Sequence, residues 1–459
     1  MGSMQINHYP AIIVGCGPCG LTTAINIAKA GIKTLILERW ETVDKSPRAA
    51  AYQPCAQAEL LETGTLDDVR AHSVINDVIT FWSGGKRVAY VEKREGGKIF
   101  PAAINCPQPK LAEILLEHLM SKYEAEVRFS QRVIGVEQEG DLVRVTAEDP
   151  KTGEVSVYTA DWVVGADGAG SAVRKLSGIE FEGFSWPKED FVATNLRGYP
   201  FYEEGFTAAN LVLHPEHWAV VTILDKTGLW RCAFGVRTGL TNEDIRKEVN
   251  EHYKHIFPNW EKHGACYELV ELNKYKPHQR CASTFRKGKV FLAGDAAHSN
   301  NPVGGLGLTT GLLDAGPLGR GLAAVISGKA PESIMDKWAE ARREKWLTYT
   351  NAFSIENKRV IQQGGYQKSS DDPLGVWEMD EVAKEHKMEH WIEEARKVTR
   401  DADEAMYKAM EDPAAQLASR MKQWDITIDP LWMAEYEDPE LVKLRMSLRP
   451  AGYQVPLEA

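Results

Sequence analysis

The stretch that decides the fold is Gly15-Cys16-Gly17-Pro18-Cys19-Gly20, near the N-terminus. Read as Gly-x-Gly-x-x-Gly, it predicts the turn that places a dinucleotide pyrophosphate on a helix N-terminus. Read as Cys-Gly-Pro-Cys, it is typical of a redox dithiol of the thioredoxin type. Both motifs occur where a strand is followed by a helix, so the sequence around them has to distinguish the two interpretations.

The flanking sequence favours nucleotide binding. Residues 11–14 are fully apolar, as in a buried parallel strand, and helical spacing follows over residues 21–31. A second strand over residues 34–37 ends in Glu38, eighteen residues after Gly20. This βαβ unit places the Glu38 carboxylate to accept from a ribose 2′-hydroxyl, and an acid there disfavours a 2′-phosphate. We therefore expect FAD or NAD rather than NADP at this unit, with both cysteines filling variable positions.

Composition excludes several classes of protein. The 459 residues allow two to four domains, and 43% hydrophobic with 26% charged residues is ordinary for a globular enzyme. A net charge of −11 gives no general attraction to nucleic acid. No apolar run approaches the ~18 residues of a membrane span, and the N-terminus does not resemble a secretory signal. Seven cysteines, an odd number, fit reduced thiols. We expect a cytoplasmic protein without a membrane span, a metal site or a nucleic-acid partner.

Further along, two more apolar strands end in turns that bear carboxylates. One strand runs into Asp167-Gly168, and another, over residues 290–293, runs into Gly294-Asp295. A glycine-rich loop over residues 302–307 then leads into a helix from about Leu308, which we expect to be broken near residues 316–317. Open α/β sheets bind ligands at the carboxyl ends of their strands, so the three turns converge on one ligand. FAD has the matching parts, namely adenosine, pyrophosphate, polyol and an electron-accepting ring.

These stretches divide the chain into three predicted parts. The first is a discontinuous FAD-binding domain over residues 1–77, 106–180 and 276–330. The second is a β-sheet substrate domain over residues 78–105 and 181–275, where aromatic, strand-like segments replace helical spacing. The third is a charged, helical C-terminal region over residues 331–459, with amphipathic stretches around 332–362 and 378–411.

In combination, the motifs resemble the group A, single-component flavoprotein aromatic monooxygenases, the p-hydroxybenzoate hydroxylase-like family. The resemblance covers roughly residues 10–325. It implies an α/β fold with a Rossmann-like FAD-binding domain of that family's type. The stretches that carry it are residues 15–20, Glu38-Arg39, Pro47-Arg48, Gln108, residues 164–174 and residues 294–302.

The resemblance also implies roles for individual residues. Glu38 would hold the adenosine ribose, Arg48 and Gln108 would contact the pyrophosphate and ribityl region, and Asp295 would bind the ribityl chain. Asp167 would lie beside both FAD and NAD(P)H, and the loop from Pro302 to Thr309 would surround the isoalloxazine. That loop lacks the family's usual Gln and Asn, so its contacts are expected from backbone N–H groups and the helix dipole. The complete set of expected cofactor residues is Gly15, Gly17, Gly20, Glu38, Arg39, Arg48, Gln108, Val133, Asp167, Asp295, Pro302, Gly305, Gly307, Leu308 and Thr309.

The chemistry implied by the resemblance is reduction of FAD by NADPH or NADH, capture of O₂ as C4a-hydroperoxyflavin, and oxygen transfer to a phenolic or polycyclic aromatic substrate. No second strand–glycine–helix unit is present, so the nicotinamide cofactor is expected to dock transiently. In the predicted second sheet, Arg231 is the candidate for orienting an anionic oxygen of the substrate. His214 or Tyr202 is the candidate for deprotonating a phenol.

Three alternatives remain open at the level of sequence. Relatives with the same fold can perform epoxidation or Baeyer–Villiger insertion instead of hydroxylation. A flavin reductase or dehydrogenase would consume NAD(P)H without inserting oxygen. A dithiol reductase would use Cys16 and Cys19. The sequence names neither the substrate nor the oligomeric state.

Overall fold

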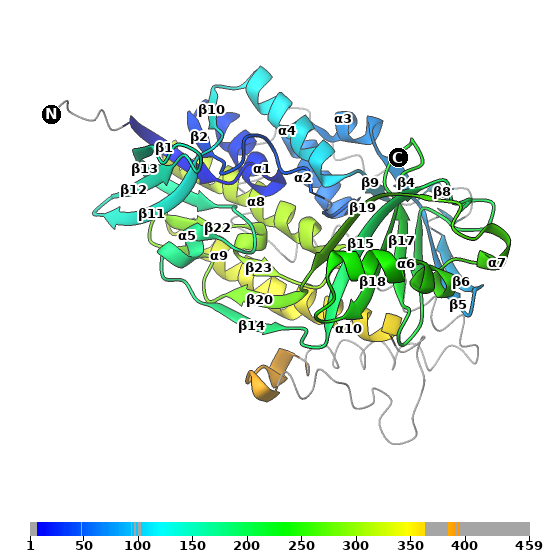
Figure 1. The fold of residues 1–459 in the computed structure, drawn as a ribbon. Coiled ribbons are helices and arrows are strands. Elements are labelled where there is room, and N and C mark those ends of the chain that lie inside the picture. Colours follow the sequence, from blue (N-terminus) through cyan, green and yellow to red (C-terminus); the bar gives the residue numbers. More distant parts are fainter. Residues whose placement is uncertain are drawn as a thin grey trace.

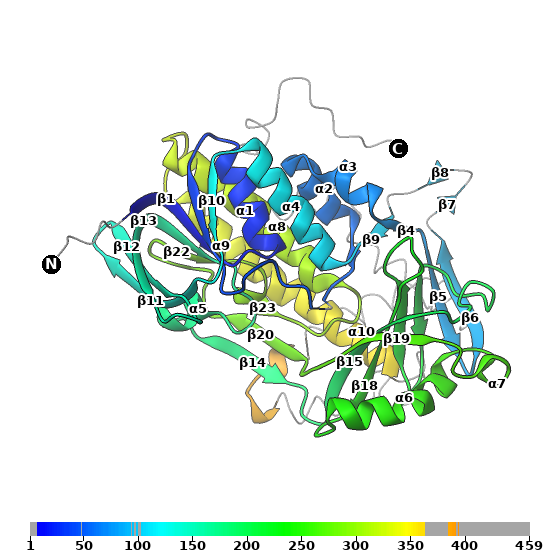
Figure 2. The same cartoon turned by 45° about the horizontal axis from the view of Figure 1, so that its top comes forward.

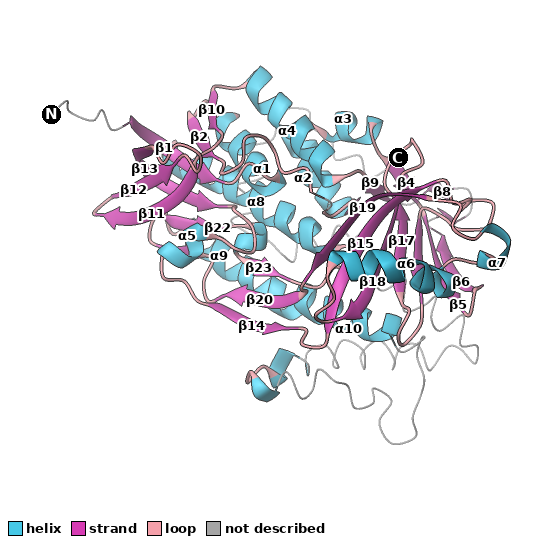
Figure 3. Ribbon diagram, viewed as in Figure 1, coloured by secondary structure: helices cyan, strands magenta, loops and turns pink. Residues whose placement is uncertain are grey.

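The computed structural model describes residues 7–46, 48–92, 94–95, 98–99, 102–362, 384–391 and 393. Two large sheets lie at opposite ends of the molecule (Figure 1). Most of the helices gather between them, with α6 over the outer side of the second sheet (Figure 3). The resulting mixed α/β architecture confirms the predicted fold class.

The first sheet is built around a parallel core. The pairing order is β10-β2-β1-β13-β12-β11, with β22 beside β13 and β21 beside β22. Strands β10, β2, β1, β13 and β22 are parallel, whereas β11 and β12 are antiparallel additions. Residues 11–14 are buried, as expected for a parallel strand covered on both faces. The bounds of these strands are β1 (Asn7–Val14), β2 (Thr34–Leu37), β10 (Ala125–Arg128), β11 (Arg132–Glu139), β12 (Leu142–Glu148), β13 (Val155–Gly165), β21 (Arg286–Lys287) and β22 (Val290–Leu292).

Helices α1 (Pro18–Ala28), α4 (Gln108–Lys122) and α8 (Leu306–Ile326) pack beside one another against this sheet. Helix α8 is continuous through Pro317 and begins two residues before Leu308, so the predicted break is wrong. Proline removes a helical hydrogen bond and pushes on the preceding turn. Nearby carbonyl oxygens receive other donors, since Trp338 Nε1 donates to Asp314 O and Thr23 Oγ1 to Ala315 O, both at 3.3 Å. These contacts tie the turn before the proline to α1 and to α9 (Ile334–Lys345).

The second sheet has seven strands in the order β19-β15-β18-β17-β16-β5-β6, all antiparallel except for the parallel β16–β5 pair. One face carries an aromatic core against α6 (Asn242–Ile256) and α7 (Trp260–His263). The other face packs against Val303 of the glycine-rich loop and against Ile361. The bounds of the strands are β5 (Val78–Ser83), β6 (Lys86–Glu92), β15 (Glu189–Arg197), β16 (Ala209–Val212), β17 (Ala219–Ile223), β18 (Trp230–Arg237) and β19 (Glu268–Tyr275).

Smaller elements connect the two sheets. Strand β14 (Phe181–Ser185) pairs with β20 (His278–Ala282), which also pairs with β23 (His298–Ser299). Strand β9 (Ala103–Asn105) lies between β3 (Ala51–Tyr52) and β4 (Val74–Asn76). Both β14 and β9 therefore pair outside the seven-stranded sheet, and the proposed division into domains stays a prediction. The remaining elements before residue 331 are α2 (Pro54–Thr63), α3 (Leu66–Ala71), α5 (Ala172–Leu176), β7 (Arg94–Glu95), β8 (Lys98–Ile99) and η1 (Gly294–Ala296).

After residue 331 the chain forms a long helical segment. Helix α9 (Ile334–Lys345) continues through the π-helical turn η2 (Trp346–Asn351) into α10 (Ala352–Gln362). This segment runs from the first sheet to the second (Figure 2). Residues 363–383 and 394–459, and with them most of the predicted stretch at 378–411, lie outside the described residues. Within the described chain, no helix combines the length and the apolar character that a bilayer crossing requires.

Candidate cofactor and substrate site

The turn after β1 has the shape that a pyrophosphate requires. Gly15 adopts a φ of +109°, and its N–H donates to Leu37 O at 2.9 Å, which ties the turn to the next strand. A Cβ atom on Gly20 would overlap the carbonyl oxygen of Gly15. At Gly17, the N-cap of α1, the space around a Cβ position is open to 4 Å, and no side chain caps the helix. The unpaired amides at this N-terminus suit an anion.

Glu38 lies directly beside this turn, at the end of β2. Its Oε2 accepts from the Cys16 N–H at 2.7 Å and its Oε1 accepts from the Trp40 N–H at 3.1 Å. A carboxylate offers about four acceptor sites, so two such bonds leave capacity for a ribose hydroxyl. Arg39 is exposed and lies over the Trp40 ring, 4.9 Å from its centroid. The strand end therefore brings Glu38, rather than Arg39, to the glycine turn.

The two cysteines of the motif are reduced and serve as packing residues. The Cys19 sulfur lies between two glycines, 2.6 Å and 2.7 Å from the Cβ positions that Gly294 and Gly311 lack. Burial raises the pKa of Cys16 to about 12 and raises the pKa of Cys19 well above its ordinary value. A thiolate is the reactive form of cysteine, and this environment disfavours it. The geometry contradicts the dithiol interpretation.

The second turn, at Asp167-Gly168, is held by its own carboxylate. Asp167 accepts from Ser171 Oγ at 2.5 Å and from the N–H groups of Ala172 and Val173 at 2.6 Å and 3.2 Å. It therefore caps α5, although burial raises the pKa of Asp167 against the effect of these bonds. The side chain predicted to face FAD and NAD(P)H is thus occupied by the following helix.

Arg174 joins the second turn, at Asp167-Gly168, to the third turn, at Gly294-Asp295. Its buried guanidinium donates to the carbonyl oxygens of Ala169 and Ala296, each at 2.7 Å. Ala296 belongs to the 3₁₀ turn that carries Asp295. The Asp295 side chain is exposed to solvent, and within the described residues no hydrogen bond holds its carboxylate. The surrounding protein nevertheless raises the pKa of Asp295 by desolvation, opposed by the charges of His298 and Arg48. An unengaged acceptor in such a position suits a polyol.

The glycine-rich loop ends in the N-terminus of α8. Gly305 is its N-cap, with a φ of +67° and no side-chain cap, so the amides of the first turn, including those of Gly307 and Leu308, face outward from the helix end. Thr309 is buried, and its Oγ1 donates back to Gly305 O at 3.3 Å. Pro302 is exposed at the start of the loop. The backbone of this segment, more than its side chains, can serve a ligand.

Three further predicted cofactor residues lie on separate elements. Arg48 is exposed and pairs with Asp44 at 3.0 Å. Gln108 opens α4, and its N–H donates to Ala49 O at 3.1 Å, which places it beside the Arg48 segment. Val133 is buried in β11, where it pairs with Ala147. Arg48 and Gln108 are brought together, whereas Pro47 lies outside the described residues.

Arg231 is the predicted catalytic residue that faces the nucleotide-binding half. On β18 it pairs across the sheet with Asn195 of β15, which pairs with Glu271 of β19. Arg231 Nε donates to Asn195 Oδ1 at 3.0 Å, and Asn195 Nδ2 donates to Glu271 Oε2 at 3.2 Å. Arg231 Nη1 donates to the carbonyl oxygen of Arg48. Burial lowers the pKa of Arg231, opposed by nearby Tyr275, Glu271 and Tyr52.

Tyr202 lies on the opposite face of the second sheet. Its side chain is 56% exposed and packs edge-on against Trp230, with ring centroids 5.1 Å apart. Trp230 and Arg231 are consecutive in β18, so their side chains point to opposite faces. Tyr202 and Arg231 are therefore not brought together.

His214 forms part of the turn between β16 and β17. Its Nδ1 accepts from the N–H groups of Glu216 and His217, at 3.0 Å and 2.9 Å, and so closes the turn. Ala219, the first residue of β17 after this turn, pairs with Phe234 of β18. Phe234 lies three residues along the strand from Arg231, which is roughly 10 Å at the usual rise, and the turn lies beyond it. His214 instead belongs to a cluster of imidazoles with His217, His252 and His255.

The sequence patterns did not identify the hydrogen-bond partners of Arg231 or of the third turn, at Gly294-Asp295. Asn195 and Glu271 become neighbours of Arg231 only through strand register, which no local pattern reveals. Asp314 in α8 accepts from His298 Nε2 at 2.6 Å, the Gly294 N–H at 3.1 Å and Arg342 Nε at 2.9 Å. The polar Asp314 within an apolar helix was the available signal, because buried charges are normally paired.

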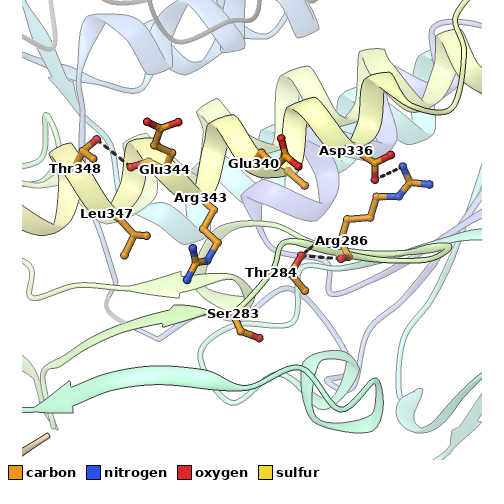
Figure 4. Close-up of a pocket in the computed structure, with 10 residues that line it drawn as sticks. Ser283, Thr284, Arg286, Asp336, Glu340, Arg343, Glu344, Leu347 and Thr348 are labelled. Atoms are coloured by element: carbon orange, nitrogen blue, oxygen red, sulfur yellow. Dashed lines mark hydrogen bonds and ion pairs between the residues drawn. The ribbon is translucent and has the colours of Figure 1, made fainter. Parts of the chain in front are cut away.

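A surface pocket of about 420 Å³ lies elsewhere, between α9 and the segment joining β20 to β21 (Figure 4). Arg286 and Asp336 form an ion pair of 2.8 Å at one end of it, and Arg343 lies on the helix side. None of the predicted cofactor or catalytic residues lines it. No group of three or more metal-ligating side chains with suitable geometry occurs in the described part of the chain.

Comparison with known proteins agrees with this geometry. Residues 8–349 match the family described as "FAD binding domain". Para-nitrophenol 4-monooxygenase from a Pseudomonas species is 38% identical over 367 residues, covering 79% of this chain and 90% of the relative. The 6-hydroxy-3-succinoylpyridine 3-monooxygenase of Pseudomonas putida is 32% identical over 405 residues, covering 85% and 94%.

A solved structure extends the likeness to three dimensions. The crystal structure of a p-nitrophenol 4-monooxygenase from Pseudomonas putida superposes with a TM-score of 0.73 at 32% identity, covering 87% of this chain and 98% of the other. The predicted family, cofactor and class of enzyme are confirmed. The chain therefore belongs to the FAD-binding family of single-component aromatic monooxygenases and is an FAD-dependent oxidoreductase that hydroxylates aromatic compounds.

Proposed function

We propose that FAD lies along the carboxyl ends of β1, β2 and β22. Glu38 holds the ribose, the N-terminus of α1 receives the pyrophosphate, and Asp295 accepts from the ribityl chain. The open space at Gly17 and the free carboxylate of Asp295 support this placement. The amides at the start of α8 then stabilise negative charge on the reduced ring. Arg48 and Gln108 complete the proposed FAD-binding residues, on the side of the site nearest Arg231.

We further propose that NADPH or NADH supplies the electrons and O₂ the oxygen atom. FAD, when bound, takes up two electrons and activates O₂ for transfer to the substrate. The protein's own residues bind and orient the aromatic ring, exclude water and favour the reactive ionisation state. A cytoplasmic location is supported by the seven cysteines, all of which are free thiols.

The substrate proposed is a para-substituted phenol or hydroxypyridine with a single ring. The names of the two relatives place oxygenation at carbon 4 of p-nitrophenol and at carbon 3 of 6-hydroxy-3-succinoylpyridine. In each compound that carbon is para to the hydroxyl group and carries the second substituent. The para carbon of a phenol is electron-rich, and loss of the phenolic proton makes it more so. A cation beside the hydroxyl oxygen would therefore assist this chemistry.

Arg231 supplies that cation, and its position is the observation that carries the proposal. Its Nε and Nη1 are fixed by Asn195 and by the Arg48 carbonyl oxygen. Its Nη2 has no hydrogen bond within the described residues, so it can bind a phenolate oxygen. The link to Arg48 places this nitrogen at the junction of the second sheet with the proposed cofactor site. A fixed guanidinium needs little reorganisation when negative charge develops beside it.

The decisive experiment uses ¹⁸O₂ with a panel of para-substituted phenols and NADPH or NADH. We expect NAD(P)H oxidation to increase with substrate, and one ¹⁸O atom to enter each product molecule. Steady NAD(P)H oxidation with unlabelled product and stoichiometric hydrogen peroxide would instead indicate a reductase. Labelling of polycyclic phenols alone would contradict the single-ring substrate while leaving the monooxygenase reaction intact.

A further inference from the structure

A buried network of neutral amides lies behind the glycine-rich loop. Asn301 Oδ1 accepts from the Val303 N–H at 3.1 Å, and Asn301 Nδ2 donates to Ser354 O at 2.8 Å. Gln279 of β20 accepts from the Asn301 N–H at 3.1 Å and donates to Ser354 Oγ at 2.7 Å. All of these polar side chains are fully buried. The loop is thus bonded on its inner side to α10 and β20.

Asn357 of α10 contacts the loop at its most constrained point. Asn357 is 2% exposed, and its Nδ2 donates to Val303 O at 3.4 Å. Gly304 has a φ of +103°, and a Cβ atom there would overlap Asn357 Nδ2. The amide therefore occupies the space that a side chain at residue 304 would need. Among the described residues its Oδ1 has no hydrogen-bond partner, so burial of this amide is not explained by its own hydrogen bonding there.

The same helix is anchored on its other side to the second sheet. Lys358 Nζ forms an ion pair of 2.6 Å with Glu189 of β15 and lies 4.3 Å from the centroid of the Trp186 ring. One turn later, Ile361 O accepts from the His214 N–H at 3.0 Å. Asn357 thus contacts the glycine-rich loop, and the next residue, Lys358, contacts the second sheet.

The π-helical turn η2 sets the direction in which these side chains face. Asn351 ends this turn, and Ser354 and Asn357 follow at intervals of three residues on α10. Asn351 Oδ1 accepts from Gln279 Nε2 at 2.9 Å, so the first two members of this series meet β20 and the third meets the loop. Single π-helical turns commonly occur at functional sites, where the extra residue redirects the helix that follows.

We propose that Asn357 is a positioning residue for the flavin ring. It holds the backbone of residues 303–305 so that the N-terminal amides of α8 keep a fixed direction, and it does so without adding charge. Electrostatic stabilisation is most effective when such donors do not reorganise. The inference rests on the proposed placement of the ring beside this loop, but it is independent of the choice of substrate.

The test compares Asn357→Ala with Ile355→Val, a matched control on the same helix. Ile355 is buried in the core of the FAD-binding half, and losing one methyl group lowers stability without touching the loop. In the FAD-free protein we expect amide hydrogen exchange over residues 303–306 to be roughly 5- to 10-fold faster in Asn357→Ala than in the control. In the FAD-loaded protein we expect an altered visible flavin spectrum and a larger fraction of NADPH consumption released as hydrogen peroxide.

Equal amide exchange rates in the two variants would overturn the proposal that Asn357 holds the loop backbone in place. Faster exchange combined with a flavin spectrum and peroxide yield equal to those of the control would overturn the link to the flavin ring. Loss of ¹⁸O incorporation in the unmodified protein would instead contradict the proposed reaction and leave the exchange result standing. If Asn357→Ala does not fold, Asn357→Ser, which retains a small polar side chain, is expected to show the same changes to a smaller extent.

Discussion

The proposed cofactor side and the proposed substrate side of this enzyme use different parts of the chain. On the cofactor side the groups are mainly backbone, namely the turn at residues 15–20 and the N-terminus of α8. On the substrate side they are side chains contributed by three strands, as in the row of Glu271, Asn195 and Arg231. Backbone groups cannot be altered without disturbing the fold, whereas side chains can be exchanged singly. We therefore expect substitutions on the first side to affect FAD binding and folding, and those on the second to affect substrate turnover more than FAD binding.

The largest effect is expected from Gly20→Ala. The added Cβ would overlap the Gly15 carbonyl oxygen, and overpacking of this kind costs about 1–3 kcal/mol or more. We expect a lower melting temperature in the FAD-free protein and almost no flavin after purification. Gly17→Ala is the matched control, because its Cβ meets nothing within 4 Å and its φ is −81°. It should leave the FAD-free melting temperature unchanged and weaken FAD binding only. Equal melting curves for all three proteins would contradict the assigned role of the turn.

The next effect is expected from Glu38→Gln. This change removes the charge from the hydrogen bond to the Cys16 N–H and from the one proposed to the ribose, but keeps the shape of the side chain. Hydrogen bonds to charged groups contribute about 1.5–3 kcal/mol, so the Kd for FAD should rise roughly 10- to 150-fold. Fluorescence titration with FAD measures this directly. Glu41→Gln, at an exposed residue just after β2 that pairs with Lys151, is the control and should bind FAD normally.

Arg231→Gln tests the substrate side. Loss of the guanidinium removes the proposed charged partner of the phenolate, so kcat/KM should fall about tenfold to a hundredfold and the rate optimum should move to higher pH. Arg231 also donates to the carbonyl oxygen of Arg48, so the Kd for FAD should rise as well, but by a smaller factor than kcat/KM falls. Binding of p-nitrophenol, followed by the absorbance of its phenolate, reports the ionisation shift separately from turnover. Tyr202→Phe, on the opposite face of the same sheet, is the control for which we expect no change.

The same difference explains how much the sequence could predict. Gly20 and Gly15 satisfy a local steric demand, and Glu38 follows at a fixed distance along one βαβ unit, so these positions could be identified from the sequence. Arg231 was identified as a candidate, but Asn195 and Glu271 were not, because their proximity depends on the register of β15 and β19.

Two other misses have equally physical causes. Tyr202 and Arg231 share a predicted sheet, and only the alternation of side chains along β18 separates them. The predicted break at Pro317 was wrong because α8 continues through it; donors from α1 and α9 reach the carbonyl groups of Ala315 and Asp314 just before the proline, contacts that no local pattern reveals.

The smallest expected effect concerns the imidazole cluster around His214, which lies on the substrate sheet yet away from Arg231. Burial and the neighbouring His255, His214 and His252 lower the pKa of His217 to about 4, with Glu216 acting weakly in the opposite direction. Burial also lowers the pKa of His252, which Glu248 opposes. His217 stacks on His255 with ring centroids 4.0 Å apart. The fold therefore favours the neutral forms of His217 and His252.

The sign of the pH dependence follows from this shift. The unfolded chain binds a proton at His217 near pH 6.5 and the folded chain only near pH 4, so the stabilising contribution is complete above 6.5 and is lost as the pH falls from 6.5 to 4. His217→Phe keeps a stacked ring and removes the proton site, so its melting temperature should fall less over this interval than that of the unmodified protein. kcat at pH 7.5 should be unchanged, because the cluster lies three residues along β18 from Arg231. A parallel decline of both melting temperatures would show that protonation of His217 is not coupled to folding, whereas a loss of kcat would place the cluster in the catalytic site after all.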